Sequence, residues 1–239
     1  MVESAGEQRY TKLMFVDNNE PLQFAQPVVL VGGGEVNVAV LRSLQAHGWP
    51  VVAADGGANI LRELDCVPAV IIGDLDSLDD LSYWQARCRL LRLTEQDTTD
   101  FEKCLYSISA PGFVALGFTG KRFDHTLAAI HSLSCYGREQ NILLVAEEDL
   151  LWVRGETTHL RLSADVRLSI YPLSPVRFES SRGLQYPLDG LLLEQGVAIG
   201  TSNRTVKADI EINQSADDAG LYLLIVPLES LTLLLDQWV

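Results

Sequence analysis

The chain has 239 residues, a formal net charge of −14 at pH 7 and a sequence pI near 4.6. That charge argues against nucleic acid and anionic membranes as partners, because both would meet a like-charged surface. Residues 1–12 lack a signal-peptide core, and no apolar run approaches the roughly 20 residues that span a bilayer. The four cysteines form no CxxC pair and show no metal-type spacing, so we interpret them as ordinary reduced thiols. We therefore expect a soluble, cytoplasmic protein with one large domain or two smaller ones.

The chain opens with a mixed, polar stretch, residues 1–26, which we expect to be a leader or peripheral segment. An apolar run at 27–31 predicts a buried strand, and the glycines of 32–34 and a helix-like segment of 37–46 follow it. This order resembles a nucleotide-binding start, but Asn37 stands where a dinucleotide fingerprint requires its third glycine. We therefore interpret the glycines as a tight strand-to-helix turn.

The next predicted strand, 51–54, ends at Asp55 and is followed by Gly56, Gly57, Ala58 and Asn59. Glycines at a strand end allow a ligand to approach the backbone closely. The helix that follows would direct its amino-terminal amides to the same place, which suits an anion. A bare turn with a helix cap is the alternative interpretation.

The third strand, 69–72, ends in Gly73-Asp74-Leu75-Asp76-Ser77. Side chains two apart on an extended chain share a face, so Asp74 and Asp76 can converge. Two carboxylates about 4 Å apart repel by roughly 1–4 kcal/mol at effective dielectrics of 80 to 20, and a divalent cation removes that repulsion. Mg²⁺ commonly bridges one or two carboxylates to substrate phosphates. A solvated acidic turn is the alternative.

A short strand at 90–93 leads into the polar segment 96–103. Asp97 is predicted to cap a helix that carries Phe101 on its apolar face. Asp100 and Lys103, at i and i+3, are expected to face the same side.

The strand at 113–116 ends in a loop with adjacent cations, Lys121 and Arg122, which suit phosphate oxygens. Asp124 is predicted to cap a helix over 126–136. His125 and His131 lack the four-residue spacing of a helical zinc pair, so each is interpreted as a capping or surface histidine.

Every polar motif up to residue 146 follows a strand, and the carboxyl ends of parallel strands form one binding edge. After about residue 150, short alternating runs predict an all-β module, a sandwich or small barrel, with a polar turn at 200–204. The predicted fold is therefore α/β: a Rossmann-like open parallel sheet domain (27–150) followed by an all-β domain (151–239).

Together these motifs resemble the thiamin pyrophosphokinase family over about residues 27–227. The segments that carry the resemblance are 54–59, 73–77, 96–103, 120–125 and 201–203. The resemblance implies transfer of a diphosphoryl group from ATP to the hydroxyl of thiamin, giving thiamin diphosphate and AMP. It also implies an α/β nucleotide-handling domain, a carboxyl-terminal β-sandwich domain over 151–239 that binds thiamin, Mg²⁺ as the metal, and a homodimer with active sites between subunits.

The resemblance also implies roles for individual residues. The metal ligands would be Asp74, Asp76 and Asp100. ATP phosphates and the reacting hydroxyl would be held by a second group: Asp55, Gly56, Asn59, Lys103, Lys121, Arg122, Asp124 and His125. Thiamin would contact Gln96, Ser202 and Asn203, with Tyr186 as the aromatic residue available over its ring. Asp124 or Asp97 would accept the hydroxyl proton, and sequence does not choose between them.

The chain departs from the family pattern at two places. Arg204-Thr205-Val206 replaces small or glycine-rich residues, and Lys121 stands where the family often has glycine. Other hypotheses are a hydroxymethylpterin diphosphokinase on the same scaffold, a non-catalytic nucleotide or thiamin sensor, and a metal-dependent phosphohydrolase. An α/β protein with acidic strand ends and no site is the simplest alternative.

Overall fold

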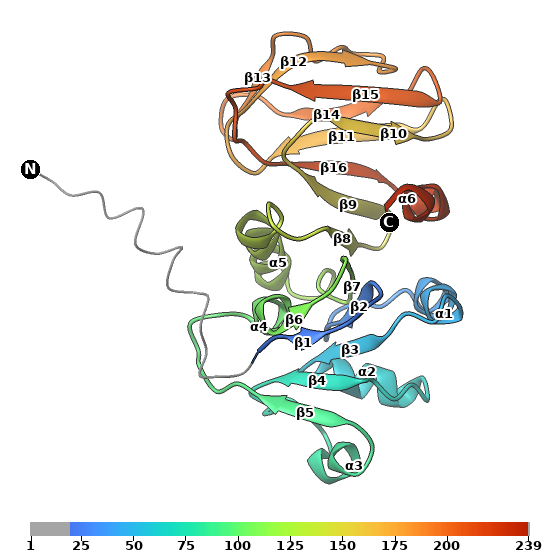
Figure 1. Ribbon diagram of the computed structural model, residues 1–239, viewed down its shortest axis with the longest axis vertical. Helices are drawn as coiled ribbons and strands as arrows, with labels where there is room; N and C mark the ends of the chain where they lie inside the picture. Colours follow the sequence, from blue (N-terminus) through green and yellow to red (C-terminus); the bar gives the residue numbers. More distant parts are fainter. Residues whose placement is uncertain (1–19, 239) are drawn as a thin grey trace, which may run out of the picture.

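The computed structural model describes residues 20–238 and shows a mixed α/β protein built on one long sheet (Figure 1). This sheet has ten strands in the order β14-β11-β16-β9-β8-β7-β2-β3-β4-β5. Its parallel part consists of β2 (Val28–Val31), β3 (Val51–Ala54), β4 (Val70–Gly73), β5 (Arg89–Arg92), β7 (Phe113–Leu116) and β8 (Ile142–Val145). Except in β5, these strands are buried on both faces, as expected for continuous apolar runs.

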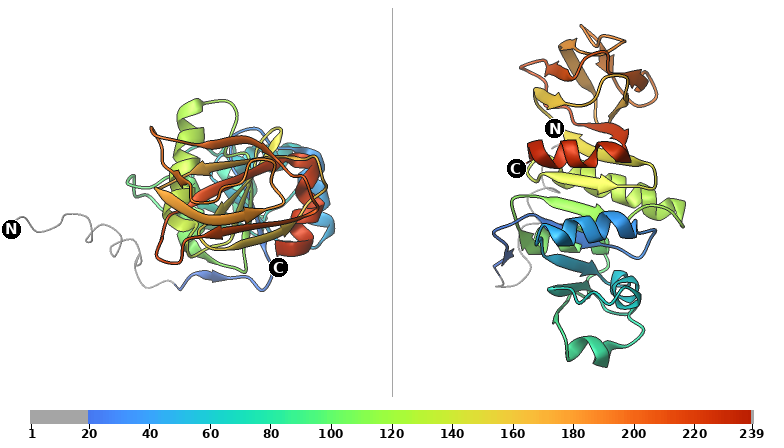
Figure 2. Two further views of the ribbon diagram at one scale, coloured as in Figure 1. Left: turned by 90° about the horizontal axis from the view of Figure 1, so that it is seen from above. Right: turned by 90° about the vertical axis from the view of Figure 1, so that its right-hand side faces the viewer.

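Helices cover both faces of the parallel part. The helices are α1 (Val38–Ala46), α2 (Gly57–Glu63), α3 (Leu81–Gln85), α4 (Asp100–Ser107) and α5 (Phe123–Tyr136). Strand β2 shows the division, because Val29 and Val31 join the core of α1, α2 and α3, whereas Val28 and Leu30 join that of α4 and α5. In the left view of Figure 2, α1 (blue) and α5 (green) lie on opposite sides of the strands. The alternation of strand side chains therefore builds two cores.

The carboxyl-terminal part is a β-sandwich that shares the long sheet. One layer continues that sheet with antiparallel strands: β9 (Asp149–Arg154), β11 (Arg167–Pro172), β14 (Gly200–Arg204) and β16 (Tyr222–Pro227). The other layer is β10 (Thr158–Arg161), β12 (Val176–Arg182), β13 (Leu192–Leu193) and β15 (Asp209–Gln214). Phe178 and Tyr222, one from each layer, meet edge to face in the core.

The first and last elements of the described residues each contact one of the two parts. Strand β1 (Leu22–Gln23) pairs in parallel with β6 (Ile108–Ser109). The chain closes with a 3₁₀ turn (Leu228–Ser230) and α6 (Leu231–Trp238), which contacts β10. Among the described residues, none of the helices combines the length and apolar character that a bilayer span requires. Most of the leader expected over 1–26 lies outside the described residues.

The predicted change from alternating strands and helices to strands alone is present, and it falls at the start of β9. However, β8 and β9 pair antiparallel with each other, so the α/β and all-β parts are joined by hydrogen bonds of one sheet. The division into two domains at this point stays a prediction.

Three local predictions are wrong. Helix α4 is capped by Thr99, whose side chain accepts from the Glu102 amide, and Asp97 is an exposed residue before it. Helix α5 begins at Phe123, so Asp124 lies in its first turn instead of capping it. The polar turn expected at 200–204 is strand β14, because this segment pairs with β11.

Candidate active site

A cavity of about 590 Å³ opens where the parallel strands end. Loops after β2, β3, β4, β5 and β7, together with α4 and α5, line it. Its lining residues are Gly32, Gly33, Gly34, Ala54, Asp55, Gly56, Asn59, Asp74, Ser77, Gln96, Thr98, Thr99, Asp100, Phe101, Lys103, Gly117, Phe118, Thr119, Gly120, Lys121, Arg122, His125, Ala128 and Ala129. The chain leaves β2 toward β3 on one side, and β7 lies on the other. The cavity therefore includes the point where strand order reverses, which is where open α/β sheets bind ligands.

Glycines form one wall by bringing two loops into backbone contact. The Gly34 amide donates to the Gly117 carbonyl at 2.6 Å, and a Cβ on Gly34 would lie 2.5 Å from the Thr119 carbonyl oxygen. Gly33 has ordinary space, because a Cβ at this position would lie 3.8 Å or more from its nearest neighbours. The Lys121 ammonium donates to the Gly33 carbonyl at 2.9 Å. The glycine turn is thus both a tight turn and a cavity wall, a role that the interpretation as a turn alone missed.

Three carboxylates converge at one end of the cavity, which Asp55 and Asp74 line and Asp76 does not. Asp55, Asp74 and Asp76 each offer one oxygen, all within 4.8 Å of one another. Asp55 is only 3% exposed, and its Oδ1 has no hydrogen-bond partner among the described residues. Its φ of 40° is a conformation that few residues other than glycine adopt. Burial raises the pKa of Asp55, opposed by a hydrogen bond from Ser77 and reinforced by the charges of Asp100, Asp74 and Asp76.

Hydrogen bonds hold Asp74 in its ionised form. The Gln96 amide nitrogen donates to Asp74 Oδ2 at 3.1 Å, and the Asp76 amide donates to Oδ1 at 3.2 Å. These two bonds lower the pKa of Asp74. An ionised, oxygen-only group beside a buried orphan oxygen is a donor set that suits a hard divalent cation such as Mg²⁺.

Asp100, the third expected metal ligand, lies outside this trio and faces a buried lysine. Lys103 Nζ lies 3.2 Å from Asp100 Oδ1 and 3.8 Å from Glu95 Oε2, and its side chain is 3% exposed. Burial opposes the charge of Lys103, but the hydrogen bond and charge of Asp100, with the charge of Glu95, outweigh it and raise its pKa. Burial also raises the pKa of Asp100, against the effect of Lys103. Both side chains line the cavity, so Lys103 presents a fixed positive charge there.

A capping box fixes this lysine in place. Glu102 Oε2 accepts from both the amide and the hydroxyl of Thr99 at 3.0 Å, while Thr99 Oγ1 accepts from the Glu102 amide at 3.2 Å. Such reciprocal bonds satisfy donors at a helix start. Thr99 thereby orients the first turn of α4, which carries Asp100 and Lys103.

The exposed rim carries the other expected phosphate-binding groups. Arg122 donates from Nε to Asp124 Oδ1 at 3.1 Å, and a second nitrogen bonds Oδ2 at 2.5 Å. This pair lowers the pKa of Asp124. Arg122 and His125 line the cavity, whereas Asp124 does not.

The residues expected to contact thiamin divide into two groups. Gln96 lines the cavity, but Tyr186, Ser202 and Asn203 lie in the sandwich part and do not. Asn203 is buried, and its side chain accepts from the Tyr186 amide at 3.0 Å and donates to the Tyr186 carbonyl at 2.7 Å. Tyr186 is 60% exposed, and Ser202 is exposed with a φ of 61°. Asn203 therefore shapes the loop that presents Tyr186.

Sequence reasoning missed several cavity residues. Phe101 and Phe118 stack with centroids 4.1 Å apart, and both line the cavity. The sequence predicts Phe101 only as a core residue of its helix. For Phe118, the available signal is its place between two glycines at a strand end. Thr98 and Ser77 also line the cavity, and each lies within a motif that the sequence analysis singles out.

A cavity at the switch point of an open parallel sheet, lined by carboxylates, a buried lysine and glycine loops, is typical of the ligand sites of α/β proteins. Residues 41–145 match the family model described as thiamin pyrophosphokinase, catalytic domain. Together with the relatives below, this match supports the thiamin pyrophosphokinase family as the one that this chain resembles.

Relatives agree in sequence and fold. The chain is 28% identical over 183 residues to thiamin pyrophosphokinase 1 of Caenorhabditis elegans, covering 69% of this chain and 75% of that protein. The crystal structure of thiamin pyrophosphokinase from Geobacillus thermodenitrificans matches with a TM-score of 0.72 and 25% identity, covering 84% of this chain and 97% of that one. The enzyme from Candida albicans matches with a TM-score of 0.73 and 16% identity, over 89% of this chain and 94% of that one, which supports the fold.

Proposed function

We propose that this protein is a thiamin diphosphokinase, which transfers a diphosphoryl group from ATP to the hydroxyl of thiamin and releases AMP. The observation that carries the proposal is a single cavity lined by buried Lys103 and by Asp55 and Asp74, two members of the Asp55–Asp74–Asp76 trio. The relatives support thiamin as the acceptor, because all the curated relatives that match are named thiamin pyrophosphokinase. The comparisons do not favour a pterin diphosphokinase or a non-catalytic sensor.

The three carboxylates of the trio suit Mg²⁺ as a ligand set. Binding of Mg²⁺ and binding of ATP are both part of the proposed function. The orphaned Oδ1 of Asp55 and the mutual approach of three acids leave negative charge that a cation would neutralise. When bound, Mg²⁺ would supply charge neutralisation of the ATP phosphate oxygens. This assignment puts Asp55 beside Asp74 and Asp76, and gives Asp100 a different part.

The remaining cavity residues position the reactants. Lys103, Lys121 and Arg122 offer positive charge to the phosphates, and Gly56 with Asn59 lets them approach the backbone at the start of α2. His125 lies at the same rim. Preorganised charge of this kind is what diphosphoryl transfer asks of a protein.

Asp100 is the proposed acceptor of the hydroxyl proton. It lines the cavity and is partly buried, whereas Asp97 and Asp124 are exposed and do not line the cavity. In-line attack on the β-phosphorus then releases AMP. The proton moves from the thiamin hydroxyl to an Asp100 oxygen.

We also propose a homodimer with active sites between subunits. Gln96 reaches the cavity of its own subunit, but Tyr186 and Ser202 are exposed away from it, so a second copy could bring them to the thiamin. Phe123 and Leu127, 73% and 53% exposed near the rim on α5, give such a copy an apolar surface to cover. A cytoplasmic location, expected from the sequence, is supported by four free cysteines.

Mixing two inactive variants tests this arrangement. Asp74→Asn and the double variant Tyr186→Ala, Ser202→Ala should each lose activity alone. Exchange of their subunits at equal amounts should restore about a quarter of wild-type activity, because half the dimers are mixed and each has one intact site. A monomer by sedimentation, or no recovery after proven exchange, would contradict the shared site.

The proposed reaction is tested with a panel of acceptors. Purified protein with ATP and Mg²⁺ should form AMP with thiamin and none with a hydroxymethylpterin, and Asp74→Asn should abolish turnover without unfolding the protein. AMP formation only with the pterin would mean that the diphosphoryl transfer is correct and that thiamin is the wrong acceptor. Phosphate release without any acceptor would indicate a hydrolase.

A further inference from the structure

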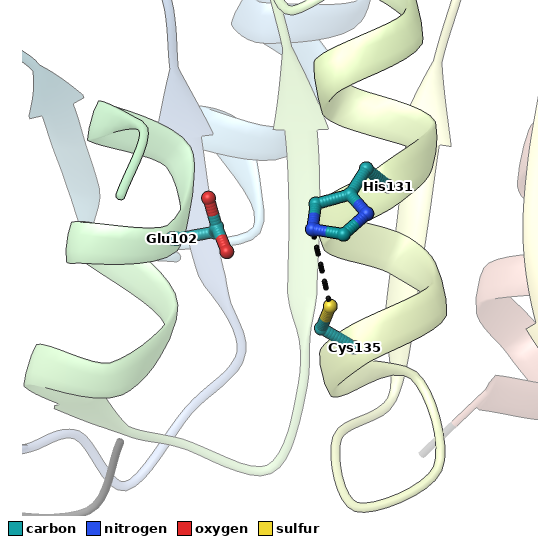
Figure 3. Close-up of side chains that lie close together, drawn as sticks. All are labelled: Glu102, His131 and Cys135. Carbon is teal, nitrogen blue, oxygen red and sulfur yellow. Dashed lines mark hydrogen bonds between the residues drawn. The ribbon is translucent and has the colours of Figure 1, made fainter. Parts of the chain in front are cut away.

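A second group of possible metal ligands lies between α4 and α5, outside the residues that line the cavity. Glu102, His131 and Cys135 each offer one donor atom, and these atoms lie within 4.8 Å of one another. Figure 3 shows the Glu102 carboxylate on α4 pointing toward α5, with His131 and Cys135 one turn apart opposite it. A carboxylate, an imidazole and a thiol together differ from the all-oxygen trio, and this donor set suits a softer metal.

The spacing on α5 brings the nitrogen and sulfur to a distance that a metal requires. His131 and Cys135 are four residues apart, so they share one helix face. His131 Nε2 lies 3.6 Å from Cys135 Sγ. With Zn–S near 2.3 Å and Zn–N near 2.0–2.1 Å, tetrahedral geometry separates the two ligands by about 3.6 Å. The pair therefore needs little movement to hold zinc, whereas a thiol–imidazole hydrogen bond is the competing explanation.

Glu102 is held in place as the third ligand. Its Oε2 accepts two bonds from Thr99, and in the described part of the chain its Oε1 accepts none. Glu102 is 6% exposed, whereas His131 is exposed and Cys135 half-buried. One side of the group is thus rigid and buried, and the other is open to water, which can supply a fourth ligand.

We propose that Glu102, His131 and Cys135 bind a zinc-like divalent cation, separate from the Mg²⁺ of the proposed reaction. Binding requires the thiolate, so the Cys135 proton passes to solvent as the metal–sulfur bond forms. The site would cross-link α4 and α5 next to Asp100 and Lys103. It does not depend on the proposed function, because none of the three residues belongs to the cavity.

Cobalt titration of the full chain tests the site. Co²⁺ bound to a thiolate gives an intense near-ultraviolet charge-transfer band, which carboxylate ligands do not produce. The wild type should develop this band with one equivalent of Co²⁺ per chain, and Zn²⁺ should displace it. Zinc should also raise the Tm of the wild type, because an ion that binds only the folded state stabilises it.

Three variants make the test specific. Cys135→Ser and His131→Gln should lose the band and the zinc-dependent rise in Tm. Cys88→Ser is the matched control, because Cys88 is the other half-buried thiol and lies outside the group; it should behave as wild type. His131 is exposed, so its variant should fold even if Cys135→Ser is destabilised. Absence of the band in wild type, its survival in either cluster variant, or its loss in Cys88→Ser would overturn the proposal.

Discussion

Replacing Asp55 by asparagine should stabilise the metal-free protein while it removes activity. The substitution keeps the size of the side chain and deletes one charge from a trio whose oxygens lie within 4.8 Å of one another. At 4.8 Å, two unit charges repel by about 1 kcal/mol at a dielectric of 80 and about 3.5 kcal/mol at 20. Asp55 is buried, but Asp74 is half-buried and Asp76 exposed, so solvent screens part of this repulsion.

The expected gain in the free energy of unfolding at neutral pH without metal is about 1–2 kcal/mol. For a chain of this size it corresponds to a rise in Tm of about 2–8 °C. Activity with Mg²⁺ should fall at least about 10- to 100-fold, since even partners of metal ligands have effects of that size. Mg²⁺ should stabilise the wild type more than the variant.

The dependence of stability on pH provides a separate check on whether Asp55→Asn stabilises or destabilises the protein. Burial raises the pKa of Asp55, so between its ordinary and its raised value the folded state binds more protons than the unfolded state. Its charge therefore destabilises the fold progressively as pH rises through the raised pKa. The Tm difference between Asp55→Asn and wild type should be small near about pH 4 and increase toward about pH 7.

Thermal unfolding in a chelator, repeated across this pH range, measures that difference directly. Subtracting the wild type removes contributions from other carboxylates, including Asp74 and Asp124, whose lowered pKa values act in the opposite direction. A variant less stable than wild type at neutral pH, or a difference that does not change with pH, would refute the reasoning.

Other substitutions test the surroundings of the trio. Lys103→Met should lower stability by about 1–3 kcal/mol, because it leaves partly buried acids unpaired, and should greatly reduce activity; exposed Lys121→Met should stay within about 0.5 kcal/mol in chemical denaturation. Thr99→Ala should lower stability by about 0.5–2 kcal/mol through loss of the helix cap, and unchanged urea unfolding would contradict that role. Gly34→Ala should destabilise the fold by steric contact with a carbonyl, whereas Gly33→Ala should fold normally, as thermal melts would show.

The ends of β2, β3, β4 and β7 were predictable because these strands are short apolar runs that stop at acids or glycines. Which acids meet was not, because that depends on the register between strands. Strand β3 pairs with β4 so that Ala54 lies opposite Ile72, and this register puts Asp55 beside Asp74. The sequence predicts Asp74, Asp76 and Asp100 as metal ligands. In the fold, Asp100 Oδ1 lies 3.2 Å from Lys103 Nζ, and its role as a metal ligand stays a prediction.

Other differences have local causes. The pair Thr99 and Glu102 has capping-box spacing, which is a stronger signal of a helix start than the lone Asp97. Asn203 is of a residue type common in turns, but it is buried in a strand, because its side chain forms hydrogen bonds with both the amide and the carbonyl of Tyr186. That contact joins segments 17 residues apart, which local patterns do not reveal.

The most direct test of the proposed reaction is a time course that quantifies nucleotides and thiamin phosphates together. With ATP, Mg²⁺ and thiamin, we expect AMP and thiamin diphosphate to accumulate one for one, and a chelator to stop both. Formation of ADP with thiamin monophosphate would contradict transfer of a diphosphoryl group. AMP or phosphate release that continues unchanged without thiamin would contradict the role of the cavity as a diphosphokinase site.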